Sequence, residues 1–301
     1  MRSYIVPVLL AGLTTAACVA EASSTPSVRG DDTADPADSD DNLDDSSLES
    51  STLAACQPSA AHPRPVVLVH GTFANKIDNW LVLKPRLEHA GYCVYALNYG
   101  ANSLTPWTFN TVYGLGPIED SAAQLASFVD QVLAATGATQ VDIVGHSQGG
   151  MMPRYYLKFL GGAEKVHALI GFGSSNHGTT LDGLAILAQA FPPIANLVVG
   201  SWCQSCLEQV RGSDFVTQLN AGGDTVPGVT YTVISTVFDE VVTPYTSQFL
   251  VGPSVTNIRL QDQCRVDLSE HVALAFDPLV GRDVLNALDP AHAVPAVCGG
   301  F

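Results

Sequence analysis

The 301 residues carry a net charge of −16, from 29 acidic and 13 basic residues, and 47% of them are hydrophobic. This length allows one large domain or two small ones. The acidic balance and the lack of a Lys/Arg cluster exclude a nucleic-acid-binding surface. Ten of the acidic and two of the basic residues lie within residues 1–56, so the rest of the chain has a net charge of only −8.

The chain begins with the pattern of an export signal. Arg2 gives a positive start, and the apolar stretch 4–17 that follows is too short to span a bilayer. Cleavage after the Ala-Glu-Ala sequence at 20–22 would make residues 1–22 a secretory signal peptide and leave a secreted protein without a transmembrane segment. The alternative is a lipoprotein signal that ends at Cys18, with the mature protein lipid-anchored at the cell surface.

An acidic leader and a set of cysteines follow. Residues 23–56 are rich in Asp and Ser and have few apolar side chains to bury, which predicts a disordered linker. Six cysteines remain besides Cys18, and an even number in an exported chain predicts disulfides, with 15 possible pairings. Cys203 and Cys206 form a C-x-x-C pair without a second pair or histidines at ligand spacing, which favours a local disulfide over a metal site.

From about residue 57 the composition changes to alternating apolar strands and helical periodicity. Strands are predicted at 65–69, 93–97, 140–144, 166–172, 231–236 and 255–260. Because helical stretches separate most of them, we expect an α/β domain over 57–301, with a mostly parallel central sheet and helices on both faces. Residues 178–222 interrupt this alternation with apolar runs of few charges, which indicate either a lid-like insertion or ordinary core helices.

The most informative motif is Gly-His-Ser-Gln-Gly at residues 145–149. It lies between an apolar strand and a helix, which is the context of a nucleophile elbow. Ser147 would occupy a strained turn that exposes its hydroxyl, and a side chain at Gly145 or Gly149 would crowd the neighbouring strand and helix. The alternative is a Gly-rich turn with an ordinary serine. A nucleophile would need a base and an acid elsewhere in the chain, so these distinguish the two interpretations.

A serine hydroxyl becomes nucleophilic when a base takes its proton and an acid orients that base. In α/β-hydrolases the acid and then the histidine follow the serine along the chain. His271 follows the last predicted strand and is the predicted base, whereas His292 lies in a Pro-rich tail. Asp239 follows the strand at 231–236 and is the predicted acid, with Glu240 as the runner-up.

The oxyanion of an acyl-transfer intermediate needs hydrogen-bond donors. Gln148 directly follows the serine, and its backbone N–H is the first predicted donor. The second is expected from the loop after the first strand, where Gly71 lets the backbone approach and Thr72 offers its N–H and its hydroxyl.

Several motifs resemble those of known lipases. The segments 69–72, 144–150 and 175–180 resemble the bacterial class 2 triacylglycerol lipases. The segments 239–244 and 276–282 resemble the C-terminal half of fungal lipase B. Together the similarity covers most of the predicted domain, although the acidic leader has no counterpart in the family and the lid-like segment does not align.

This resemblance implies the α/β-hydrolase fold and a serine carboxylic-ester hydrolase, foremost a triacylglycerol lipase that acts through an acyl-enzyme on Ser147 without a cofactor or metal. It implies Asp239 rather than Glu240 as the acid, and Thr72 with Gln148 as the oxyanion donors. It also implies three disulfides, which are Cys56–Cys93, Cys264–Cys298 and, as the remaining local pair, Cys203–Cys206.

Other functions stay open at this point. The same triad serves esterases for short-chain or polymeric esters and acyltransferases, and a hydrolase scaffold can also act as a non-catalytic surface binding protein. The expected partner is a lipid or another ester, met at a lipid–water interface in the lipase interpretation.

Overall fold

The computed structural model of the chain describes residues 56–189 and 202–299. The predicted signal peptide, Cys18 and all of the predicted linker except Cys56 lie outside the described residues, as does the 190–201 part of the lid-like segment. Within the described ranges, no helix combines the length and the apolar character that crossing a membrane requires.

A sheet of six parallel strands forms the centre of the described structure, in the order β2-β1-β3-β4-β5-β6. The strands are β1 (Val66–Val69), β2 (Val94–Leu97), β3 (Val141–His146), β4 (Val166–Phe172), β5 (Thr230–Ser235) and β6 (Val255–Arg259). The prediction of a mostly parallel sheet is therefore confirmed. Parallel strands end at the same edge, so the loops after β1, β3, β5 and β6 come together there.

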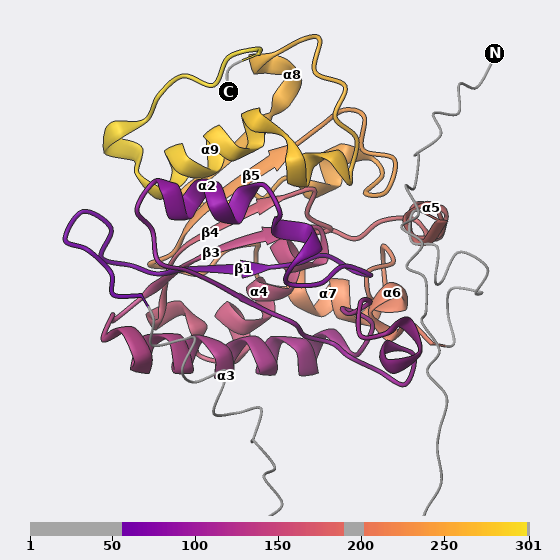
Figure 1. The fold of residues 1–301 in the computed structure, drawn as a ribbon. Helices are drawn as coiled ribbons and strands as arrows, with labels where there is room; N and C mark the ends of the chain where they lie inside the picture. The colour runs from indigo at the N-terminus through magenta and orange to yellow at the C-terminus, as the bar shows by residue number, and fades with distance from the viewer. Residues whose placement is uncertain (1–55, 190–201, 300–301) are drawn as a thin grey trace, which may run out of the picture. The chain divides into compact units, whose positions relative to one another are not determined.

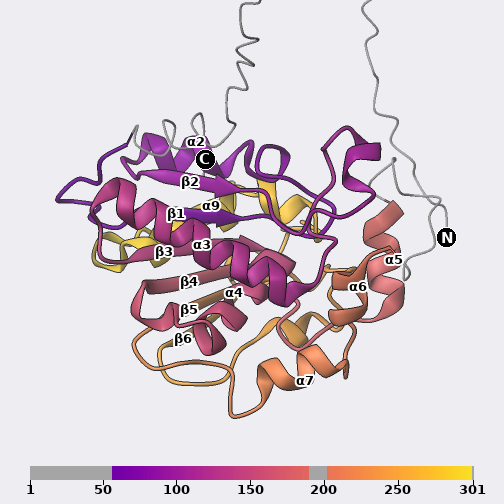
Figure 2. The ribbon, with the colours of Figure 1, turned by 90° about the horizontal axis from the view of Figure 1, so that it is seen from below.

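Helices cover both faces of this sheet, as Figure 1 shows. One face carries α2 (Leu83–His89) and α9 (Pro278–Leu288), and the other carries α3 (Ile118–Thr136) and α4 (Gln148–Phe159). In the view of Figure 2, α3 and α4 lie in front of the strands, while α5, α6 and α7 gather at one end of the sheet. The remaining helices are α5 (Leu181–Gln189), α6 (Gln204–Glu208), α7 (Asp214–Asn220), α8 (Leu260–Gln263), and 3₁₀ turns at Asp78–Trp80, Thr105–Thr108, Gly162–Glu164, Tyr245–Gln248, Ala273–Phe276 and Pro290–His292.

The apolar runs of the sequence follow from burial on both faces of the sheet. In β1, Val67 and Val69 pack into the core under α3 and α4, while Val66 and Leu68 pack into the core under α2 and α9. Strands covered on both faces have no polar side to alternate with, so they appear in the sequence as continuous apolar runs.

Two element boundaries differ from the prediction near the candidate site. Strand β3 extends to His146, because this residue still pairs with Phe172 of β4, so the elbow begins directly at the strand end. The stretch after His271 predicts a helix that starts near Phe276, whereas helix α9 starts at Pro278 and a separate 3₁₀ turn over Ala273–Phe276 precedes it. Asp277 caps α9 by accepting hydrogen bonds from two backbone N–H groups of its first turn.

The described part of the lid-like segment contributes to the core as well as to the candidate site. Leu184 and Leu187 of α5 are buried in an apolar cluster with Phe73 and Val241. Leu187 also lines the pocket described below.

Within the described ranges, three disulfides tie loops to this scaffold. Cys56 is bonded to Cys93, directly before β2, and Cys264, after α8, is bonded to Cys298 near the C-terminus. Cys203 and Cys206 close the first turn of α6.

Candidate active site

Ser147 stands in a strained turn between β3 and α4. Its φ of 55° and ψ of −123° lie outside the regions that L-residues ordinarily adopt. A Cβ atom on Gly145 would overlap the carbonyl of Gly149, and one on Gly149 would overlap the carbonyl of Val69 in β1. Close contact between strand and helix thus requires glycine at both positions, as the elbow pattern predicts.

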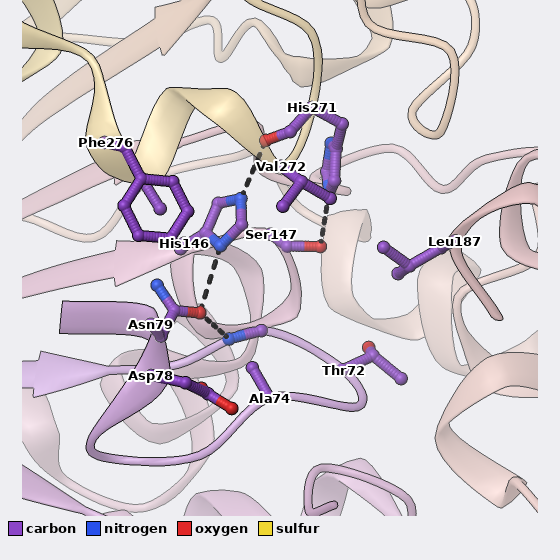
Figure 3. A pocket seen from close by; sticks show the side chains of 12 residues that line it. Thr72, Ala74, Asp78, Asn79, His146, Ser147, Leu187, His271, Val272 and Phe276 are labelled. Atoms are coloured by element: carbon purple, nitrogen blue, oxygen red, sulfur yellow. Dashed lines mark hydrogen bonds between the residues drawn. The ribbon is translucent and has the colours of Figure 1, made fainter. Parts of the chain in front are cut away.

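The predicted base contacts this serine, and the predicted acid contacts the base. His271 Nε2 is 3.0 Å from Ser147 Oγ, and His271 Nδ1 is 2.9 Å from Asp239 Oδ2. All three residues are buried, and Figure 3 shows the imidazole directly beside the serine hydroxyl. Because the carboxylate accepts a hydrogen bond from the Nδ1–H group, Nε2 keeps its lone pair and faces the serine as a proton acceptor.

Three further donors hold the Asp239 carboxylate in this orientation. Its Oδ1 accepts hydrogen bonds from the backbone N–H groups of Val241 and Val242 at 3.0 and 2.7 Å, and its Oδ2 accepts one from Gln248 Nε2 at 2.8 Å. Glu240, the runner-up acid, instead accepts a 3.3 Å bond from the backbone N–H of His271. The structure therefore places Asp239, and not Glu240, at the imidazole.

The charges around His271 oppose the effect of its burial. Burial alone lowers the pKa of an imidazole, because it disfavours the cation. The charge of Asp239 and its hydrogen bond outweigh this effect, and Glu240 and Glu270 add to them, so the pKa of His271 lies above its ordinary 6.5. The site consequently stabilises a protonated imidazole, which is the form a base reaches after taking a proton.

The two predicted oxyanion donors are open. Among the described residues, no protein atom accepts a hydrogen bond from the backbone N–H of Thr72 or of Gln148. The N–H groups on either side of Thr72 are occupied, since Gly71 donates to Asn79 Oδ1 at 3.0 Å and Phe73 donates to the Tyr113 carbonyl at 2.9 Å. The loop is thus held at its flanks, with the Thr72 N–H left available.

Asn79 and His146 connect the separate loops of the site. His146 Nδ1 lies 3.1 Å from Asn79 Oδ1, and its Nε2 lies 3.1 Å from the backbone carbonyl of His271. Burial, with a smaller contribution from His271, lowers the pKa of His146 to about 3, so the ring is neutral at pH 7. Figure 3 shows this chain of contacts from the oxyanion loop through Asn79 and His146 to the His271 loop.

A mainly apolar pocket of about 150 Å³ opens onto the serine. Its lining comes from the oxyanion loop, the Asp78–Asn79 turn, the elbow, α5 and the segment after His271, as Figure 3 shows. The lining residues are Gly71, Thr72, Ala74, Asp78, Asn79, His146, Ser147, Leu187, His271, Val272, Ala275 and Phe276. No cluster of three or more His, Cys, Asp or Glu side chains that could hold a metal occurs in the described parts of the chain.

Comparison with known proteins places this geometry in a family. A family model described as "Lipase (class 2)" matches residues 63–280, which is more than half of the chain. The chain belongs to the class 2 lipase family. The matched region contains Thr72, Ser147, Asp239 and His271.

Individual proteins similar to this chain are also named as lipases. A triacylglycerol lipase of Burkholderia plantarii is 39% identical over 111 residues, which cover 35% of this class 2 lipase and 28% of that protein. Lipase B of Pseudozyma antarctica is 25% identical over 250 residues, covering 78% of this chain and 65% of that protein. This chain therefore matches less than two thirds of the length of either relative.

The fold is that of the α/β-hydrolases. The crystal structure of Aspergillus fumigatus lipase B superimposes with a TM-score of 0.61 at 22% identity, covering 80% of this chain and 57% of that one. At this identity the superposition shows the fold alone, and it agrees with the parallel sheet and the helices on both of its faces.

Sequence reasoning missed several residues that support the site. Asn79, Gln209 and Gln248 are buried polar residues that each donate to, or accept from, a predicted catalytic loop. None belongs to a recognisable motif. Asn79 and Gln209 each stand directly beside a charged residue, Asp78 and Glu208, and nothing in these stretches indicates a partner. His292, in contrast, is exposed and pairs with Asp289 on the surface.

Proposed function

We propose that this class 2 lipase is a serine ester hydrolase in which Ser147, His271 and Asp239 form the catalytic triad. The observation that carries the proposal is the continuous hydrogen-bonded chain from Ser147 Oγ to the Asp239 carboxylate, next to two unoccupied backbone N–H groups. A nucleophile, its base, the orienting acid and oxyanion donors are the parts that acyl transfer requires.

The mechanism follows from the contacts. Ser147 Oγ attacks the ester carbonyl carbon while His271 Nε2 takes the hydroxyl proton. The carbonyl oxygen becomes an oxyanion, which accepts hydrogen bonds from the N–H groups of Thr72 and Gln148. Collapse of this intermediate breaks the bond to the alcohol oxygen, which leaves with the proton from His271. Water then attacks the acyl carbon while giving a proton to His271, and the bond from that carbon to Ser147 Oγ breaks. His271 returns the proton to Oγ, and the carboxylic acid leaves.

The proposed substrates are triacylglycerols with long acyl chains. The relatives named triacylglycerol lipase and the apolar pocket wall of Leu187, Val272, Ala275 and Phe276 support this class. We also propose that the protein is exported, since three disulfides are typical of oxidising compartments. Residues 1–22 are the proposed signal peptide, and residues 178–222 the proposed lid-like segment of the catalytic domain.

The test is hydrolysis of p-nitrophenyl esters from two to sixteen carbons, and of a triacylglycerol emulsion, by the full chain and by Ser147→Ala. A lipase hydrolyses the long esters and the emulsion, and the alanine variant loses this activity. Activity confined to the shortest esters would reassign the protein as an esterase. An Ser147→Ala variant as active as the wild type would contradict the proposed mechanism outright.

A further inference from the structure

Gln209 lies behind the proposed oxyanion site and contacts it through one side-chain atom. It follows α6, just beyond the Cys203–Cys206 turn, and is 1% exposed. Its Nε2 donates to Thr72 Oγ1 at 2.9 Å and to the backbone carbonyl of Ser205 at 3.1 Å. Its Oε1 accepts a hydrogen bond from Ser175 Oγ at 2.9 Å.

These contacts determine which way round the Gln209 amide lies. The Ser205 carbonyl can only accept a hydrogen bond, so the amide nitrogen must face it. The same nitrogen then faces Thr72 Oγ1, which makes Gln209 the donor in that contact. With its lone pair engaged, the Thr72 hydroxyl must direct its own hydrogen away from Gln209.

The hydrogen of Thr72 is thus left for an acceptor on the pocket side. Among the described residues, the Thr72 hydroxyl donates to Gln148 Oε1, at the longer distance of 3.2 Å. Thr72 also lines the pocket, and Figure 3 shows its hydroxyl oxygen on the side toward Ser147. An oxyanion forming at Ser147 is a stronger acceptor than a neutral amide, because a hydrogen bond to a charged oxygen is roughly twice as strong.

From this geometry we infer that Gln209 is a positioning residue, which orients the Thr72 hydroxyl so that it donates to the oxyanion of the proposed reaction. The inference rests on the proposed function and adds a residue from outside the recognised motifs. The α6 turn holds Gln209 in place, because Ser205 also bonds to the Gly114 carbonyl at 2.6 Å and to the Leu115 carbonyl at 3.2 Å, next to the oxyanion loop.

The experiment compares two substitutions of Gln209 in the full chain, with kcat and KM measured on p-nitrophenyl octanoate at pH 8. Gln209→Met keeps the approximate shape but cannot donate, and we expect kcat to fall about tenfold with KM nearly unchanged, since the lost contact acts in the transition state. Gln209→Glu keeps the shape more closely, but its carboxylate accepts the Thr72 hydrogen and reverses the bond. We expect a further fall in kcat, to about a hundredth of the wild-type value.

A purely structural role predicts instead that kcat falls in step with melting temperature in both variants, because a carboxylate or a thioether beside the Ser205 carbonyl disturbs the α6 turn. The decisive control is Thr72→Val, which removes the hydroxyl but keeps the backbone N–H. In this background Gln209→Met should change kcat less than about twofold, because the group it orients is absent. Losses that multiply in the double variant would overturn the inference. If Gln209→Met does not fold, Gln209→Glu supplies the same cycle.

Ser175→Ala serves as the matched control, because it removes the hydrogen bond at Gln209 Oε1 and leaves the donor to Thr72 in place. We expect its kcat to stay within about threefold of the wild type while its melting temperature falls. Wild-type protein that hydrolyses no ester would refute the proposed function itself. Active wild type together with an unchanged kcat in Gln209→Met would refute only the role of Gln209.

Discussion

The two halves of the candidate active site are held in opposite ways. In the acid–base half, the Asp239 carboxylate meets four donors, from Val241, Val242, Gln248 and His271. In the oxyanion half, the backbone N–H groups around Thr72 are bonded, but those of Thr72 itself and of Gln148 have no acceptor among the described residues.

The two halves differ because the carboxylate charge and the oxyanion charge exist at different times in the proposed reaction. A buried carboxylate is charged throughout the proposed reaction, and leaving it without donors would cost several kcal/mol, so it is fully satisfied in the resting protein. An oxyanion exists only in the transition state, so its donors must stay free until then. An unpaired buried donor costs roughly 1–3 kcal/mol, and the bonded flanks of the loop keep the open N–H groups in place. The acid–base half therefore depends on hydrogen bonds that the resting protein already makes. The oxyanion half depends on N–H groups that stay without an acceptor until the transition state.

The largest effect is expected from breaking the first half at Asp239→Asn. The two backbone donors of Val241 and Val242 still meet the remaining oxygen, but the new NH₂ group cannot accept a hydrogen bond from the Nδ1–H group of His271. The imidazole then adopts the wrong tautomer, and kcat should fall about 10⁴-fold. Kinetics on a p-nitrophenyl ester measure this. A loss of less than tenfold would mean that Glu240 can act as the acid in place of Asp239.

The second half can be disturbed separately at Gly114. This residue has φ +71°, and a Cβ atom there would lie 3.0 Å from Gln148 Oε1 and 3.2 Å from Thr72 Cα. Gly114→Ala should displace the oxyanion donors and lower kcat about tenfold, because small misplacements of catalytic groups are costly. It should also lower stability by about 1 kcal/mol, since alanine disfavours positive φ.

Gly137→Ala is the matched control for this substitution. Gly137 has φ +68° with no atom within 4 Å of the added Cβ, so it carries the same backbone penalty without crowding the site. Gly137→Ala should therefore lower the melting temperature by the backbone penalty alone and Gly114→Ala by at least as much, whereas only Gly114→Ala should lose activity. Equal kcat values in both variants would show that the oxyanion loop tolerates displacement.

The sequence predicted the fold well because the fold depends on patterns that repeat. Apolar runs separated by helical periodicity are visible for most strands of the sheet, and the prediction of a mostly parallel arrangement is confirmed. The 178–222 segment could not be resolved in the same way. Buried Leu184 and pocket-lining Leu187 lie one helical turn apart in α5, and the same apolar composition serves both roles.

In the candidate site, too, some residues could be predicted from the sequence and others could not. Ser147, Asp239 and His271 could be proposed from the sequence because each follows a strand, and parallel strand ends meet at one edge. Asn79, Gln209 and Gln248 could not, since their roles depend on which way a single side chain turns after packing. The residues that hold the site residues in place are therefore harder to predict from the sequence than the site residues themselves. Each of them needs its own mutational test.

Gln248→Met tests the support of the acid–base half. It removes one donor from Asp239 Oδ2 and should lower kcat about fivefold, because the carboxylate keeps its two backbone donors and loses only part of its alignment. Gln263→Met is the matched control, since Gln263 Nε2 donates to Asp283 Oδ1 at 2.9 Å in an equivalent Gln–Asp pair outside the pocket lining. We expect both variants to lose stability, but only Gln248→Met to lose activity. A similar kcat in the two would contradict the role of Gln248.

The smallest effect is expected from Glu240→Gln, which changes a charge near the imidazole without changing the triad. The negative charge of Glu240 helps to raise the pKa of His271, so its removal should lower that pKa. His271 must be neutral to act as a base, and activity is therefore lost as the pH falls through its pKa. The acid limb of the kcat/KM profile should shift to lower pH, by less than about one unit, with the plateau near pH 8 unchanged.

Glu270→Gln should shift the acid limb in the same direction by less, since Glu270 raises the pKa of His271 less than Glu240 does. A limb that stays in place in both variants would show that neither carboxylate acts on His271 through its charge.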